Sequence, residues 1–280
     1  MAEPHQHEYS YEIRPDTYGV SARELWHYRH LALLLAWRNV RARYKQTFLG
    51  MGWAVLAPLG FTLIFVLLFQ LTAVKASGNL PYIPTVFSGM ILWQLFSRGL
   101  ADGGTSLSVN ANLITKVYFP RLLLPASSVL SGVADFLVAL VLLCLLLAWY
   151  GAVPPFPRVL AAPFFVALVL VVTLAGSLWL SALDGVFRDL RHAVPLLLQL
   201  GMFICPVAYT TVAIVPERWL WLYEFNPMVA CLEGFRWTLL QDAPAPSASA
   251  LGKGLAVAFV LMAGGVYFFA RVESTVADRV

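Results

Sequence analysis

Long apolar stretches separated by short polar segments run along most of this 280-residue chain. An α-helix needs about 20 apolar residues to cross a hydrocarbon core of roughly 30 Å. Six stretches approach that length, and they cover residues 53–74, 80–101, 125–150, 159–183, 193–215 and 254–270. The pattern therefore predicts an all-α integral membrane protein whose six transmembrane helices lie within residues 48–280.

Composition and charge agree with this fold class. Hydrophobic residues make up 60% of the chain and charged residues 12%, whereas about a quarter of the residues of a soluble domain are charged. If the N-terminus is cytoplasmic, 14 of the 19 Lys and Arg residues fall in cytoplasmic segments, as the positive-inside rule requires. We therefore expect both termini in the cytoplasm. The net charge of +4 is too small to predict nucleic-acid binding.

An amphipathic helix is expected before the first span. Residues 1–20 are a polar tail, and residues 21–47 carry a helical stripe that is basic except for Leu34, at positions 23, 27, 30, 34, 38, 41 and 45. The opposite side is apolar, with Leu25, Tyr28, Leu33, Leu35 and Val40. Such a helix lies in the cytoplasmic membrane interface, either as an anchor alone or as an anchor that also contacts a partner.

The loop between the second and third spans contains the stretch KVYFPRLLLP, residues 116–125. Gly103 and Gly104 would end the preceding helix, and residues 105–117 can form a short helix. Pro120 and Pro125 mark where the next helix begins, because proline is tolerated only in a first turn. A short helix facing the cytoplasm would be a docking surface. The alternative is an ordinary basic loop that obeys the positive-inside rule.

Two short apolar segments, residues 216–224 and 228–241, lie between the fifth and sixth spans. They predict a re-entrant helical hairpin on the outer side, with Asn226 as the N-cap of its second helix. Glu233 and Arg236 are three residues apart and could pair across one turn. Aromatic residues in this region either anchor the membrane interface or form a lid, and they include Trp219, Trp221, Tyr223 and Trp237.

Motifs for catalysis and metal binding are missing from the sequence. The chain contains no G-x-x-x-x-G-K-[ST] phosphate loop, no H-E-x-x-H and no G-x-S-x-G motif. None of the five histidines lies well inside a span, so we expect no metal site. Cys144, Cys205 and Cys231 lie in apolar sequence without C-x-x-C spacing, and we expect them to be small core residues.

One ionisable residue, Asp135, lies deep in a predicted span. A charge at mid-membrane costs about 2.5–3.5 kcal/mol, so the carboxylate should face the protein interior or water. We favour a structural role over a proton relay, because no second acid lies in another span. Phe61, Phe65 and Phe69 recur every four residues and share one helix face. That face contacts lipid, or it lines a channel in which sugar rings slide past the flat side chains.

Five blocks of the sequence carry a resemblance to a known family. They are RNVRARYKQTFLGMGWAVLAPLGFTLIFVLLFQ, PYIPTVFSGMILWQLFS, ITKVYFPRLLLPASSVLSGVADF, VFRDLRHAVPLLLQLGMFICPVAY and NPMVACLEGFRWTLL, in that order. Between residues 38 and 240 the chain resembles the permease subunit of type-2 ABC transporters that export polysaccharides. The exporters of O-antigen, teichoic acid and capsule belong to this family.

The resemblance implies a homodimer of six-helix subunits in the bacterial inner membrane, bound to two copies of a cytoplasmic ABC ATPase. The ATPase would bind ATP and Mg, so this chain would hold no cofactor and would be a transport subunit, not an enzyme. A lipid-linked polysaccharide would leave through a tunnel at the dimer interface. Alternatives change the cargo to teichoic acid, capsule, a drug or a small lipid, or make the chain a proton-coupled carrier without an ATPase.

The resemblance also implies roles for individual residues. Coupling to the ATPase would involve Asn110, Asn112, Lys116, Tyr118, Arg121, Arg188, Asp189 and Arg191. The lipid headgroup of the incoming substrate would be attracted by Arg38, Arg41, Arg43 and Lys45. The channel would be lined by Phe61, Phe65 and Phe69. The outward gate would be formed by Trp219, Trp221, Tyr223, Phe235 and Trp237.

Overall fold

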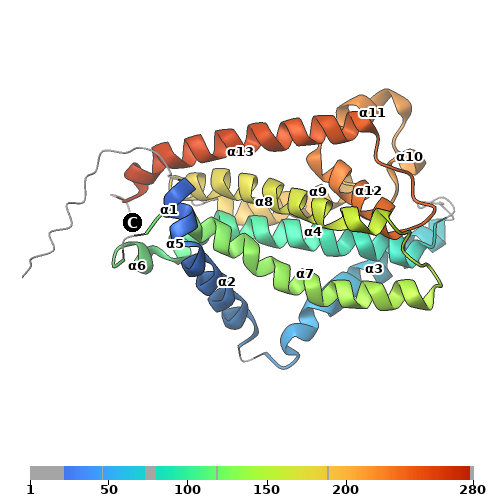
Figure 1. Cartoon of the computed structure of the whole chain (residues 1–280), viewed down its shortest axis with the longest axis horizontal. Coiled ribbons are helices and arrows are strands. Elements are labelled where there is room, and N and C mark those ends of the chain that lie inside the picture. Colours follow the sequence, from blue (N-terminus) through green and yellow to red (C-terminus); the bar gives the residue numbers. More distant parts are fainter. Residues whose placement is uncertain (1–21, 46, 73–79, 118, 188, 278–280) are drawn as a thin grey trace, which may run out of the picture.

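The structure is a computed structural model that describes residues 22–45, 47–72, 80–117, 119–187 and 189–277. Within these residues the chain is helical and contains no strand. Long helices run side by side along the long axis of the molecule (Figure 1). They are α3 (Trp53–Thr72), α4 (Tyr82–Gly104), α7 (Leu123–Trp149), α8 (Ala162–Asp184), α9 (Leu190–Ile204) and α13 (Ala248–Ala277). Two 3-10 turns precede α3 and α8, at Gly50–Gly52 and Arg158–Ala161.

Four of the six predicted spans are long and apolar enough to cross a membrane. They are Gly50–Phe69, Leu123–Trp149, Arg158–Asp184 and Ala248–Val272, and they contain most of α3, all of α7 and α8, and most of α13. The described residues therefore support a multi-pass membrane protein. The second and fifth predicted spans, which correspond to α4 and α9, do not meet the same criteria, each for its own physical reason.

Helix α4 is not apolar enough to be recognised as a span, because it carries Gln94, Arg98 and Asp102 on its second half. Its surroundings explain why this composition is tolerated. Along the first half, side chains such as Phe87 and Leu92 are fully buried, and α4 packs mainly against α7 and α8. Protein side chains rather than lipid surround most of α4, so polar groups can be paired inside the bundle.

Helix α9 is too short for the predicted span 193–215. It has 15 residues, which correspond to about 22 Å, less than a hydrocarbon core of roughly 30 Å. The helix ends at Ile204 because Cys205 precedes Pro206, and the residue before a proline is driven into an extended conformation. Cys205 has ψ 151°. An irregular segment, residues 205–210, follows and leads to the single turn α10 (Thr211–Ile214).

The contact between α4 and α8 is built from small residues. Gly99 and Gly103 of α4 face Thr173 and Ser177 of α8, and a Cβ on either glycine would overlap these side chains. The Ser177 hydroxyl donates to the carbonyl of Gly99 at 3.2 Å. Small residues four apart let helix backbones approach closely in a membrane bundle. The α4–α8 pair therefore forms the tightly packed centre of the molecule.

Short helices gather at the two ends of the bundle (Figure 1). At one end lie α1 (Ala22–His27), α5 (Ser106–Val109) and α6 (Ala111–Ile114). The prediction of a short helix within residues 105–117 is confirmed, although it is divided into two turns. Its anchors are Leu107 and Phe119, which are buried in a core cluster that α2, α7, α8 and α13 share with this segment.

The opposite end contains α10, α11 (Glu217–Tyr223) and α12 (Pro227–Leu239). The two short helices predicted between the fifth and sixth spans are therefore confirmed. Asn226 caps α12 as predicted, because its side chain accepts a hydrogen bond from the backbone N–H of Met228 at 3.0 Å. Most of α12 is buried against α8, α13 and α4. Whether this hairpin re-enters the membrane stays a prediction.

Helix α2 (Arg29–Tyr44) crosses the outside of the bundle and packs on α7. Its buried face consists of Ala32, Leu35, Ala36 and Val40. Leu35 and Val40 of the predicted apolar face pack on the bundle, whereas Leu33 is exposed on the surface of the chain. The polar tail 1–20 lies outside the described residues.

Two of the three cysteines are in the core, and one is not. Cys205 and Cys231 are buried free thiols, as predicted. Cys144 is exposed on α7, so its predicted core position is wrong. In a chain that crosses a membrane, an apolar side chain can face lipid instead of protein, and local sequence does not distinguish the two.

Candidate functional site

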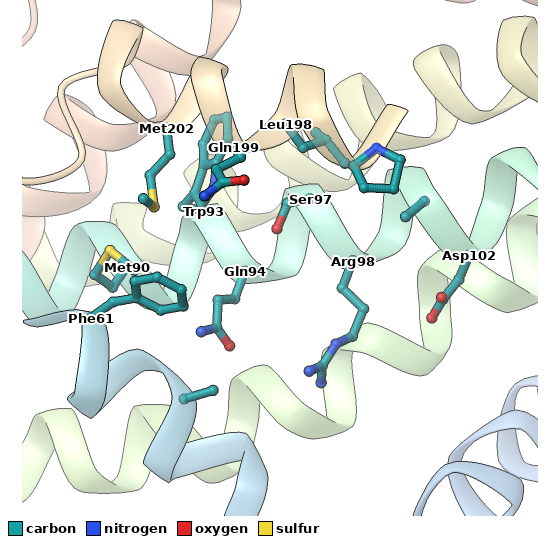
Figure 2. Close-up of a pocket in the computed structure, with 13 residues that line it drawn as sticks. Phe61, Met90, Trp93, Gln94, Ser97, Arg98, Asp102, Leu198, Gln199 and Met202 are labelled. Atoms are coloured by element: carbon teal, nitrogen blue, oxygen red, sulfur yellow. The ribbon is translucent and has the colours of Figure 1, made fainter. Parts of the chain in front are cut away.

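A cavity of about 580 Å³ opens between α3, α4 and α9. Figure 2 shows Gln94, Ser97, Arg98 and Asp102 of α4 along its wall, with Gln199 of α9 on the other side. Spacings of three and four residues place the α4 side chains on one helix face. This polar face was not among the sites predicted from the sequence, although its periodicity is visible once α4 is known to be a helix.

The apolar part of the cavity wall is formed by aromatic and thioether side chains. Phe61 comes from α3, Trp93 and Met90 from α4, and Met202 from α9 (Figure 2). Amides and hydroxyls can bind the hydroxyl groups of a ligand, while flat rings contact its apolar faces. This combination is suited to binding and guiding a ligand such as a sugar.

Beside the cavity lies an ion cluster, which we define as Arg43, Tyr44, Arg98, Asp102 and Asp135. Asp135 Oδ2 accepts from Nη1 of both Arg43 and Arg98 at 2.5 Å each. Tyr44 donates its hydroxyl to Asp135 Oδ1 at 2.5 Å, and Arg43 Nη2 lies 2.8 Å from Asp102 Oδ2. Two guanidinium groups and two carboxylates balance in charge. The cluster joins α2, α4 and α7.

The surroundings of Asp135 confirm that its carboxylate faces the protein interior. Its side chain is 11% exposed, and every polar contact just described comes from another helix. Pairing of this kind is what a carboxylate within a membrane bundle requires. The geometry agrees with the structural role favoured by the sequence.

Arg43 differs from the other three residues assigned to the lipid headgroup. Its guanidinium turns into the ion cluster, where it also donates to the Ser131 hydroxyl at 3.2 Å. The sequence contained a signal for this orientation. Arg43 lies off the basic stripe and three residues after Val40, on the buried face of α2.

The remaining basic residues of α2, Arg38, Arg41 and Lys45, are exposed and line a groove of about 660 Å³. Trp37 lies in the same groove, with the Arg41 guanidinium 5.4 Å from its ring centroid. Arg38 Nη2 donates to Asn110 Oδ1 at 2.6 Å. The structure therefore brings a predicted headgroup residue into contact with a predicted coupling residue.

The two predicted cytoplasmic loops meet at a buried carboxylate, Asp184, which was not among the predicted site residues. Asp184 accepts from Ser108 Oγ of α5 at 2.5 Å and from Arg191 Nε of α9 at 2.8 Å. This contact places Arg191 beside the α5–α6 segment. Of the other predicted coupling residues, Asn112, Lys116 and Asp189 are exposed and Arg121 is half-buried. Tyr118 and Arg188 lie outside the described residues.

The three phenylalanines of α3 are not equivalent. Phe61 is partly exposed and lines the cavity. Phe65 is buried, with its ring centroid 5.8 Å from that of Phe203 on α9. The Phe69 ring lies 5.8 Å from that of Tyr82 on α4. In a single copy of the chain, the structure thus brings only Phe61 of this set to the cavity.

The predicted gate residues also divide into exposed and packed groups. Trp219 and Trp221 of α11 are exposed, at 51% and 59%. The Tyr223 hydroxyl lies 2.9 Å from that of Tyr209 and donates to the carbonyl of Ile204 at 2.7 Å. This network ties α11 to the end of α9.

Phe235 and Trp237 belong to α12 and occupy different environments. Phe235 is buried, and its ring lies 6.1 Å from that of Phe136 on α7. Trp237 is half-buried, with the Arg158 guanidinium 5.4 Å from its ring centroid. Phe235 is therefore a core residue in this structure, whereas the α11 tryptophans present open aromatic surfaces at this end.

A buried arginine, Arg236, holds this end of the molecule together. Its side chain donates to the backbone carbonyls of Thr85 at 3.1 Å and Tyr209 at 2.7 Å, and also to that of Val207. The predicted pairing with Glu233 gives way to this arrangement, in which Glu233 accepts instead from the backbone N–H of Thr211. Only the three-dimensional fold brings these carbonyls together.

No group of three or more metal-ligating side chains occurs among the residues that the structure describes. The polar clusters of this region of the chain are ion pairs and hydrogen-bonded networks between helices. They can position groups and bind a ligand, and the cavity of α3, α4 and α9 contains both charged and aromatic side chains.

Most of the chain matches known proteins. The profile of the family described as "ABC-2 type transporter" matches residues 30–240. The chain is 36% identical over 242 residues to the O-antigen export system permease protein RfbA of Myxococcus xanthus, covering 86% of this chain and 91% of that protein. It is 28% identical over 206 residues to a protein of the same name from Klebsiella pneumoniae, covering 74% of this chain and 78% of the relative.

The matched region runs from the start of α2 to the end of α12. It includes the cavity, the ion cluster, the α5–α6 segment and the α10–α12 end of the bundle. The chain belongs to the ABC-2 type transporter family.

Proposed function

We propose that this chain is the membrane-spanning subunit of an ATP-driven exporter that moves an O-antigen-like, lipid-linked polysaccharide from the cytoplasm across a bacterial inner membrane. The observation that carries the proposal is the 36% identity to an O-antigen export permease over 91% of that relative's length. The cavity adds chemical support, since its amides, hydroxyl and aromatic rings suit a sugar chain.

In this proposal the chain does no catalysis of its own. A separate cytoplasmic ABC ATPase binds ATP and Mg and docks on the end that contains α5 and α6. Support comes from the contacts of Asp184, which hold Ser108 and Arg191 of the two cytoplasmic loops in one unit. A movement of the ATPase against this unit would act on α4, α8 and α9 together.

Two copies of the chain enclose the tunnel. Helix α9 forms one wall of the cavity, and its outer face exposes Leu196, Leu197, Leu200, Phe203 and Ile204. A second copy would cover such a face and complete the cavity wall. The exposed tryptophans of α11, Trp219 and Trp221, would then form the outward gate, and both termini would lie in the cytoplasm.

The groove on α2 attracts the pyrophosphate of the lipid carrier. Arg41 and Lys45 are exposed there and act as point charges that need no fixed geometry. Each basic residue near a membrane surface contributes about 1 kcal/mol of attraction for anionic headgroups. Arg43 is left out of this role because its charge is balanced inside the ion cluster.

Export by the complex in inside-out vesicles, with the ATPase and its native lipid-linked glycan, tests the proposal. Arg41→Gln combined with Lys45→Gln should lower the export rate at limiting substrate by about 30-fold, since losing about 2 kcal/mol of attraction changes affinity by that factor. Arg271→Gln, at an exposed site of α13, is the matched control. Export by the chain without any ATPase would overturn the proposal.

A further inference from the structure

The ion cluster connects the cavity wall on α4 with the helices α2 and α7. Arg98 and Asp102 line the cavity, while their partners Asp135 and Arg43 lie on α7 and α2. We propose that the cluster is a latch that holds α2 on the bundle and sets the place of Arg98 in the cavity wall, with Asp135 as its positioning residue. Only the role of this latch in export rests on the proposed function.

Both arginines contact the carboxylate of Asp135, which is joined at Arg43 by that of Asp102. Nη1 of Arg43 and Nη1 of Arg98 share Asp135 Oδ2 at 2.5 Å each. Without that oxygen, two like charges would face each other at the centre of the cluster. Removing one partner of a buried ion pair is strongly destabilising, because it leaves the other charge uncompensated. The loss of Asp135 should therefore drive the two arginines, and their helices, apart.

Apolar packing at α2 is modest, so the charged contacts have a large share in holding it. The buried face of α2 consists of two alanines, Ala32 and Ala36, together with Leu35 and Val40. Small side chains remove little apolar area from contact with water or lipid. Arg43 and Tyr44 then fix the last turn of α2 through the cluster.

The other side of α2 is tied to the α5–α6 segment. Arg38 donates to Asn110 between these two turns, and it precedes Arg43 by five residues, or about 7.5 Å along a helix. One rigid helix thus joins the expected docking segment to the cavity wall. In this arrangement a displacement of α5 and α6 is transmitted through α2 to the ion cluster, and from there to Arg98.

The latch predicts that the effect of a substitution depends on the net charge left in the cluster, whereas a purely packing role predicts no such dependence. Arg43→Gln leaves the cluster with one excess negative charge, and Asp135→Asn leaves it with one excess positive charge. The double variant is neutral again. If the cluster acts through its charges, the double variant should recover much of what each single variant loses, which is the pattern a double-mutant cycle detects.

The position of α2 can be measured directly by thiol labelling. Ala36→Cys, on the buried face, is introduced into the purified chain in nanodiscs after Cys144, Cys205 and Cys231 have been replaced by alanine. A membrane-impermeant maleimide should label it about tenfold faster in the Asp135→Asn background, because α2 opens more often. The Arg43→Gln/Asp135→Asn double variant should return the rate to within about threefold of the parent.

Two further variants make every outcome decisive. Ala42→Cys, on the exposed side of α2, should be labelled rapidly in all backgrounds, which controls for reagent access. Asp102→Asn removes the more exposed carboxylate and should raise labelling of Ala36→Cys to an intermediate rate, even if Asp135→Asn does not fold. Unchanged labelling in both aspartate variants, or a double variant no better than the singles, would overturn the latch.

The labelling needs neither ATPase nor glycan, so its result is independent of the proposed function. Export by the complex then tests the link to transport. If the latch transmits movement, Asp135→Asn should lower export and the double variant should restore part of it. If the labelling rates follow the net charge of the cluster while the parent complex exports no glycan, that combination would refute the proposed function and would still support the latch.

Discussion

Replacing Arg236 with methionine is the sharpest test of how the α10–α12 end of the molecule is held. The side chain is 2% exposed, and it donates to the backbone carbonyls of Thr85, Val207 and Tyr209. These carbonyls belong to the first turn of α4 and to the irregular segment after α9. Arg236→Met keeps a side chain of similar length and leaves all three acceptors without this donor.

The magnitude follows from the three bonds. A hydrogen bond to a charged group contributes about 1.5–3 kcal/mol, so the gross loss is about 4.5–9 kcal/mol. Removing the guanidinium also removes the cost of burying its charge, which amounts to several kcal/mol. We expect a net destabilisation of about 3–5 kcal/mol. At about 2–4 °C per kcal/mol, the unfolding temperature should fall by about 6–20 °C.

Thermal unfolding of the purified protein in detergent, followed by tryptophan fluorescence, measures this effect. Arg218→Met is the matched control, because Arg218 is exposed on α11 and its loss should change the unfolding temperature by less than about 2 °C. Arg236→Lys should give an intermediate value, since an ammonium group cannot span three acceptors as a guanidinium does. An Arg236→Met protein as stable as the wild type would refute the reasoning.

Two other predictions concern the same end of the molecule. A Cβ at Gly89 would overlap the Val207 carbonyl and the Arg236 guanidinium, so Gly89→Ala should lower the unfolding temperature, whereas Gly60→Ala, which meets nothing within 4 Å, should be neutral or stabilising. The effects of Gly89→Ala and Arg236→Met should be less than additive in a double variant, because both disturb one contact. Hydrogen bonding from Lys253 and from neighbouring serines lowers the pKa of Glu224 to about 2. Because the pKa of Glu224 is lower in the folded state, its charge stabilises the fold at pH values above its ordinary pKa of 4.5. This stabilisation should disappear as the pH falls from 4.5 to about 2. The difference in unfolding temperature between wild type and Glu224→Gln should therefore shrink over that interval, and a constant difference would contradict the assignment.

Much of the fold follows from apolar periodicity and turn chemistry. For α3, α7, α8 and α13, most of the predicted ends lie within a few residues of the observed ends. These spans are long, apolar and separated by polar loops. Capping of α12 by Asn226 is also predictable, because it depends on residues two positions apart. Local sequence is sufficient when the interactions that decide a structure are local.

The second and fifth predicted spans, which correspond to α4 and α9, show where prediction from local sequence is insufficient. Hydropathy measures suitability for lipid, but α4 is covered by protein and tolerates Arg98 and Asp102 for that reason. The end of α9 was predictable from Pro206, yet the apolar residues that follow it suggested a continuous helix. For α4 the tertiary environment outweighs average hydrophobicity, whereas for α9 the local restriction before Pro206 does.

The candidate site was less accessible from sequence than the fold. The ion cluster pairs Arg43 with Asp135 across 92 positions, and Arg236 reaches Thr85 across 151. A single sequence gives no measure of such distances. The orientation of Arg43 was the exception, since its offset from the basic stripe already placed it on the buried face of α2.

The composition of α4 has a consequence for how the chain is made. Arg98 and Asp102 lower the hydrophobicity of the second half of α4, so this helix is less suited than α3, α7 or α8 to leave the translocon alone. The carboxylate that neutralises Arg98 lies 37 residues further along, and a ribosome adding about 5–20 residues per second needs roughly 2–7 s to reach it. During synthesis α4 should therefore wait beside the translocon until α7 emerges, so that the two helices enter the lipid as a pair.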